Sequence, residues 1–198
     1  MRKLLFVLAV LVIGASARAD TVNVGLIRYN NGNWAYGYPY FAVVFGFGLA
    51  PVFTPVLCDD YEHSGNPPSV WRANTTNLGS RDLTLLRFNE EPDALLRYQE
   101  AGWLLLQTLN APRPSWVGIN YAIWSLFDPN APLTPLGAWW LRQAERAASN
   151  GFPRTDFTRV EILTPLNQHD PDPNRPQELM YIVITHRDDA PASLASTP

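Results

Sequence analysis

The sequence predicts an α+β fold: a mostly antiparallel sheet of sandwich or barrel-like form with an insertion of three helices. Segments rich in β-branched and aromatic residues occupy the N-terminal third of the chain and recur near its end. Between them, apolar residues recur at helical spacing. Strands from both ends of the chain should therefore form one sheet, against which the helices pack.

Four strands are expected before the helices. Residues 21–27 alternate loosely, residues 36–47 combine aromatic and β-branched side chains, and residues 71–76 are expected to form another short strand. Residues 51–58 also read as a strand, but they contain two prolines. Because proline cannot donate a ladder hydrogen bond, we expect this strand at a sheet edge or a bulge.

Three helices follow, over residues 92–109, residues 118–127 and a segment framed by Thr134 and Gly151. The two prolines after residue 111 are expected to end the first helix. Thr134 has the side chain of an N-cap, a proline follows it at the first helical position, and Gly151 is placed to end the third helix. Strands are expected again at residues 157–163 and 179–185.

The N-terminus has the pattern of an export signal. A basic start (Met1 to Lys3) precedes ten apolar residues and an Ala17-Arg18-Ala19 cleavage site. The apolar run is too short to span a bilayer, which takes about 20 residues. We therefore predict a signal peptide over residues 1–19, one domain over residues 20–186, a disordered tail over residues 187–198, and no stable membrane span after cleavage.

Composition excludes several classes of function. Removal of the signal takes away three of the 15 basic residues and none of the 18 acidic ones, which leaves a 179-residue chain of net charge −6 without lysine. Such a chain cannot form a Schiff base or a Walker-type phosphate site, and it lacks the basic face of a nucleic-acid binder. Its one cysteine excludes an internal disulfide and a Cys-rich zinc site.

The densest group of reactive residue types is Cys58 to His63. Asp59, Asp60, Glu62 and His63 would supply oxygen and imidazole ligands to a metal. The alternative is a strand that ends in a polar turn, and it is favoured because no second group of ligands stands out in the sequence. A Cys58 nucleophile would need a base, and no histidine has a context that identifies it as one. A buried cysteine that packs as a small apolar side chain, or one that pairs between chains, also fits.

Three stretches together resemble a known family: residues 56–61 (VLCDDY), 98–105 (YQEAGWLL) and 119–127 (INYAIWSLF). Over residues 20–185 the chain resembles exported bacterial proteins of the Pro-Glu-Pro sorting-signal (PEP-CTERM) type, whose passenger domain is similar to the thioester domains of bacterial surface adhesins. Residues 190–194 (APASL) resemble the start of that sorting signal, but no apolar span or basic tail follows. The resemblance implies an envelope or extracellular protein that is released rather than anchored.

In thioester domains, a cysteine on a strand is bonded to the side chain of a glutamine that opens a Gln-x-Ala-Ile-Trp helix. By this resemblance Cys58 matches the cysteine, and Ala122 to Trp124 match the helix motif. Asn120 occupies the glutamine position and is one methylene shorter, so its carbonyl would have to lie closer to sulfur. Cys58 and Asn120 are thus the candidate thioester pair, and Asp59, Asp60 and Trp124 are candidate binding residues.

These observations favour an exported surface or matrix-type protein with a non-enzymatic binding or structural role. The expected partner is a surface ligand, protein or carbohydrate, and no cofactor or metal is expected. Two alternatives stay open: a covalent adhesin that uses the Cys58–Asn120 thioester, and a metal-dependent or cysteine hydrolase centred on residues 58–63.

Overall fold

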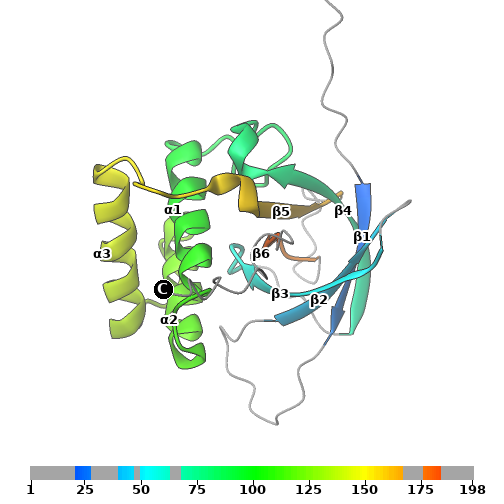
Figure 1. Ribbon diagram of the computed structural model, residues 1–198, viewed down its shortest axis with the longest axis horizontal. Coiled ribbons are helices and arrows are strands. Elements are labelled where there is room, and N and C mark those ends of the chain that lie inside the picture. The colour runs from blue at the N-terminus through cyan, green and yellow to red at the C-terminus, as the bar shows by residue number, and fades with distance from the viewer. Residues whose placement is uncertain (1–20, 28–39, 47–49, 63–67, 167–175, 184–198) are drawn as a thin grey trace, which may run out of the picture.

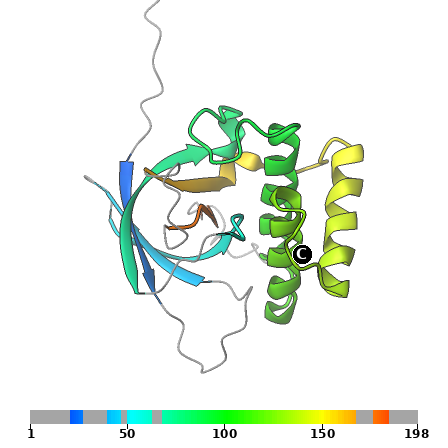
Figure 2. The same cartoon turned by 180° about the vertical axis from the view of Figure 1, so that it is seen from behind.

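The computed structural model describes residues 21–27, 40–46, 50–62, 68–166 and 176–183. These residues form a β-barrel that lies beside a layer of three helices (Figures 1 and 2). The strands are β1 (Thr21–Ile27), β2 (Tyr40–Phe45), β3 (Val52–Cys58), β4 (Ser69–Asn77), β5 (Val160–Pro165) and β6 (Leu179–Ile182). The helices are α1 (Ala94–Gln107), α2 (Arg113–Phe127) and α3 (Pro135–Ser149), with short 3₁₀ turns at Leu78–Ser80 and Phe157–Arg159.

The six strands close into an antiparallel barrel in the order β1-β2-β3-β6-β5-β4, which confirms the α+β prediction. The closed order places β3 between β2 and β6, so the expectation of an edge strand is wrong. However, β3 pairs with β6 only at Leu57 and Cys58. Pro55 lies before this short ladder, where a missing N–H interrupts no bond to β6.

Side-chain alternation along the strands divides the apolar core in two. Val56 and Cys58 of β3 point into the barrel, where they join buried residues of β1, β2 and β4. Leu57 points the other way and packs with residues of the helical layer. Trp124 of α2 belongs to the barrel cluster rather than to the helical one. This tryptophan therefore links the helices to the inside of the barrel.

Helix α2 begins five residues before the expected start. The prolines that were expected only to end the first helix also open the second: Pro112 is its N-cap, and a proline occupies one of its first two positions. Proline is well tolerated there because the first N–H groups of a helix have no partner within it. Helix α3 begins as predicted, and the Thr134 hydroxyl oxygen accepts a 3.0 Å bond from the Gly137 N–H.

The predicted signal peptide, C-terminal tail and His63 lie outside the described residues. Among the residues that the structure does describe, none belongs to a helix both long enough and apolar enough to cross a bilayer.

Candidate functional site

Cys58 occupies the last position of β3 and is fully buried. Its side chain lies inside the barrel because it follows Leu57, which faces the helices. The sulfur accepts a hydrogen bond from the Asp60 N–H at 3.3 Å and donates one to the Asp60 carbonyl oxygen at 3.0 Å. The turn after β3 therefore holds the thiol in place.

Asn120 of α2 reaches the same position from the helical layer. Its side-chain oxygen accepts a 3.1 Å hydrogen bond from the Cys58 backbone N–H, across 62 residues of sequence. Its Nδ2 is buried and has no hydrogen-bond partner among the described residues. Trp124, one helical turn later, packs at 5.2–5.3 Å between ring centroids against Tyr61 and Tyr121. The structure thus brings together Cys58, Asn120 and Trp124.

A cluster of buried carboxyl groups lies beside the cysteine. Asp59 is fully buried, and neither of its carboxyl oxygens has a hydrogen-bond partner of normal geometry among the described residues. Glu178, also fully buried, accepts bonds from the Tyr98 hydroxyl at 2.6 Å, the Arg87 N–H at 3.0 Å and the Thr164 hydroxyl. Glu178 lies directly before β6 and thereby connects the start of β6 to β5, to α1 and to the loop that precedes α1.

Asp60 belongs to a second polar connection. Its carboxylate forms a buried ion pair with Arg87, and its backbone carbonyl accepts a 3.0 Å bond from the Gln177 side chain. Arg87 also donates to the Pro176 carbonyl at 3.1 Å. Asp60 and Arg87 therefore fix the segment that leads into β6 against the end of β3.

The surroundings shift the pKa of several of these groups. Burial raises the pKa of the Cys58 thiol well above its usual value, and the neighbouring Asp59 raises it further. Burial also raises the pKa of Asp59, with an additional contribution from the charge of Glu178. The same two causes raise the pKa of Tyr98. Cys58 is therefore held as a thiol, which is a poor nucleophile.

The metal and hydrolase alternatives gain no support from this geometry. Within the described ranges, no three His, Cys, Asp or Glu side chains are arranged to hold a metal ion. Asp60 is committed to Arg87, and the thiol of Cys58 is protonated and buried. His63, the fourth residue of the proposed ligand set, lies outside the described part of the chain.

Sequence reasoning missed Arg87, Tyr98 and Glu178. The one available signal was a glutamate directly before the apolar strand at 179, where a charge is unusual unless it is paired. Its partners come from β5, α1 and a loop, all distant in sequence, so spacing could not identify them.

Comparison with solved structures gives a structural similarity. No family model matches the chain, and no curated protein matches it. Among solved structures, the N-terminal domain of the Streptococcus pyogenes pilus tip adhesin Cpa is similar over 84% of this chain and 95% of that chain, with a TM-score of 0.47 and 10% sequence identity.

Replacing Asn120 with leucine should destabilise the protein by about 1–3 kcal/mol, because the buried Cys58 N–H would lose its acceptor. Urea denaturation checks this value. Ser125→Ala on the same helix is the matched control, since the Ser125 hydroxyl donates to the Ala122 carbonyl within α2 rather than to the barrel. It should change stability by less than about 0.5 kcal/mol. Equal losses in both variants would contradict a bridging role for Asn120.

Replacing Asp59 with asparagine should stabilise the protein increasingly as the pH rises above about 4, the pKa of an unfolded aspartate. The raised folded pKa means that the unfolded state loses this proton first, so the wild-type protein loses stability above that pH. The difference in the free energy of unfolding between the variant and the wild type should grow by up to about 1.4 kcal/mol per pH unit until the pH reaches the pKa of Asp59 in the folded state. Denaturation curves at several pH values measure it.

Asp82→Asn is the control, because its effect on stability should have the opposite dependence on pH. Hydrogen bonds from Thr84 lower the pKa of the exposed Asp82, so this carboxylate stabilises the fold above about pH 4. Its removal should lower stability at neutral pH and leave it unchanged in acid. If the difference in unfolding free energy between Asp59→Asn and the wild type stayed constant across the pH range, the raised pKa of Asp59 would be contradicted.

Proposed function

We propose that this chain is an exported surface or extracellular-matrix-type protein with a non-enzymatic binding or structural role. The sequence of residues 1–19 supports export, since it has the basic start, apolar run and small-residue cleavage site of a signal peptide. The resemblance of residues 190–194 to a sorting signal agrees with an envelope or extracellular location.

One observation carries the non-enzymatic assignment: the Cys58–Asn120 pair is closed to solvent and engaged in a structural bond. Cys58 is 0% exposed and Asn120 only 2% exposed. The Asn120 side-chain carbonyl accepts a hydrogen bond from the Cys58 N–H, and the Cys58 thiol donates one to the Asp60 carbonyl oxygen. A group that must react with an external molecule needs access to it. This pair instead joins α2 to the barrel.

A binding role is supported by the outer face of the barrel. Phe53, Val43, Gly25 and Val70 are successive cross-strand neighbours on β3, β2, β1 and β4. Phe53 is 63% exposed and Val70 is 71% exposed, and no charged side chain belongs to this row. Exposed apolar surface of this kind is typical of interaction sites. The partner we propose is a surface ligand, either protein or carbohydrate.

A covalent adhesin is the second candidate, favoured by the direct contact between Cys58 and Asn120. In that case the thiol would attack the Asn120 side-chain carbonyl, form a thioester and release ammonia. The raised pKa of Cys58 and the burial of both residues act against this reaction.

Export is tested by expressing the chain with its own N-terminus in a bacterial host and fractionating the cells. We expect the chain outside the cytoplasm, with Asp20 as its first residue. A variant in which the apolar run is interrupted, Leu8→Arg, should accumulate uncleaved in the cytoplasm. Uncleaved wild-type protein in the cytoplasm would overturn the export proposal.

Intact-mass spectrometry separates the two candidates. The structural role predicts the full mass, with Cys58 alkylated only after denaturation, and no capture of methylamine. A thioester predicts a mass lower by one ammonia and covalent methylamine incorporation that disappears in Cys58→Ala. The variant Asn120→Gln, which restores the missing methylene, shows whether side-chain length limits the reaction.

A further inference from the structure

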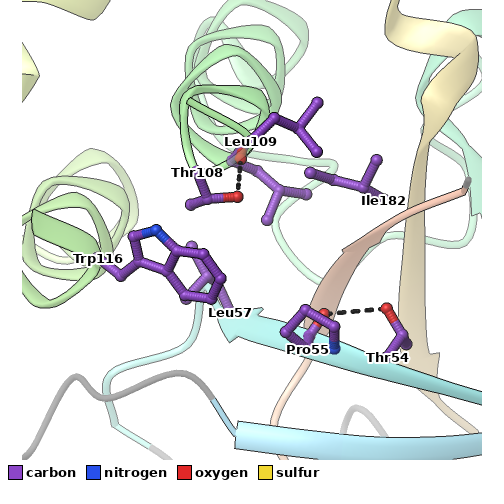
Figure 3. A pocket seen from close by; sticks show the side chains of 8 residues that line it. Thr54, Pro55, Leu57, Thr108, Leu109, Trp116 and Ile182 are labelled. Atoms are coloured by element: carbon purple, nitrogen blue, oxygen red, sulfur yellow. Dashed lines mark hydrogen bonds between the residues drawn. The ribbon is translucent and has the colours of Figure 1, made fainter. Parts of the chain in front are cut away.

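A pocket of about 240 Å³ lies between the barrel and the helical layer, on the side of β3 that Leu57 faces and the Cys58 side chain does not (Figure 3). Leu57 and Leu105 form buried parts of its wall, from β3 and α1 respectively. Trp116 lies on one side of the pocket, with Leu109 and Ile182 on another. The half-exposed Leu109 leaves the pocket open at its rim.

The pocket follows from the short ladder between β3 and β6. These strands pair only through Leu57 and Cys58, whereas β3 continues back to Val52. Side chains of β3 before Leu57 therefore have no paired residue on β6. The end of α1 and the start of α2 cover the space from the helical side. The pocket is thus built into the joint between the two layers.

The lining presents an apolar surface to a ligand, although it includes two threonines and a tryptophan. None of its eight residues is charged. The Thr108 hydroxyl donates to the Leu105 carbonyl at 2.6 Å, and the Thr54 hydroxyl donates to the Pro55 carbonyl at 3.2 Å. The Trp116 indole N–H donates to the Ala111 carbonyl at 3.2 Å. No lining side chain therefore has a free N–H or O–H for a ligand.

We propose that this pocket binds a free, uncharged aromatic molecule of one or two rings. An apolar cavity of about 150 Å³ is large enough to bind benzene, so about 240 Å³ suits a somewhat larger ring system. Trp116 and Pro55 supply flat surfaces for ring contacts. An ionised ligand is excluded because its charge would be buried without a partner.

The lining also favours a free molecule over an aromatic side chain of a protein partner. A side chain of a protein partner brings two backbone amides to the rim, and an amide oxygen that loses its water there would need a donor from the lining. The lining side chains have none left. Desolvating an unpaired amide opposes binding. The proposal is independent of export and of the chemical state of Cys58.

The test is a titration of the purified full chain with 5-fluoroindole, followed by fluorine NMR. Saturable binding is expected, and indole should compete with it. Leu109→Trp places a bulky ring at the pocket and should weaken binding at least about tenfold. Leu96→Trp is the matched control, since Leu96 and Leu109 are exposed leucines (43% and 47%) and only Leu109 lines the pocket. This control should bind as the wild type does.

Two further probes test the class of ligand. Anionic indole-3-acetate should compete far less than indole, and so should N-acetyltryptophanamide, which carries the indole on a peptide-like frame. The proposal is overturned if fluoroindole does not saturate, if both leucine variants weaken binding equally, or if indole-3-acetate competes as well as indole. Equal or better competition by N-acetyltryptophanamide would overturn the free-molecule assignment and identify a protein side chain as the occupant.

Discussion

The hydrogen bond from the Cys58 N–H to the Asn120 side chain is the contact on which the joint between barrel and helices depends. It connects the end of β3 to the middle of α2, and Trp124 enters the barrel core one helical turn later. Burying the indole contributes on the order of 2 kcal/mol or more of hydrophobic stabilisation. The hydrogen bond also fixes the rotation of α2 about its axis, because Asn120 and Trp124 must face the barrel together. A shift of the helix by one residue would lose both contacts.

Buried charge fixes the other side of the same joint. Burying a carboxylate is costly unless it is paired or protonated, and this protein uses both solutions. Asp60 is paired with Arg87, while Asp59 has a raised pKa next to Glu178. Removing one partner of a buried ion pair is strongly destabilising, because the other charge is left buried and unpaired. The effect of these groups here is to hold the segment before β6 in register, where the ladder to β3 is only two residue pairs long.

The sequence predicts local structure well where one physical signal acts alone. Alternation identified β1, and Thr134 identified the start of α3. Prediction failed where one residue type serves two purposes: a proline can end one helix and begin the next, and Pro55 is compatible with a barrel strand when the neighbouring ladder is short. Asn120 could be nominated only through a family resemblance, whereas Cys58 also stood out in the densest group of reactive residue types. The partners of Glu178 could not be nominated at all, because they depend on pairing between strands far apart in sequence.

The burial of Cys58 and Asn120 opposes a reactive thioester more than the short side chain of Asn120 does. The Cys58 N–H polarises the Asn120 carbonyl as a backbone donor does in an oxyanion hole, which on its own would favour attack by sulfur. Attack nevertheless requires a thiolate, and burial raises the pKa of this thiol. A thioester, once formed, would also have to meet an external nucleophile, yet both residues are buried. The features that make this contact a firm joint therefore oppose both the formation of the bond and its use.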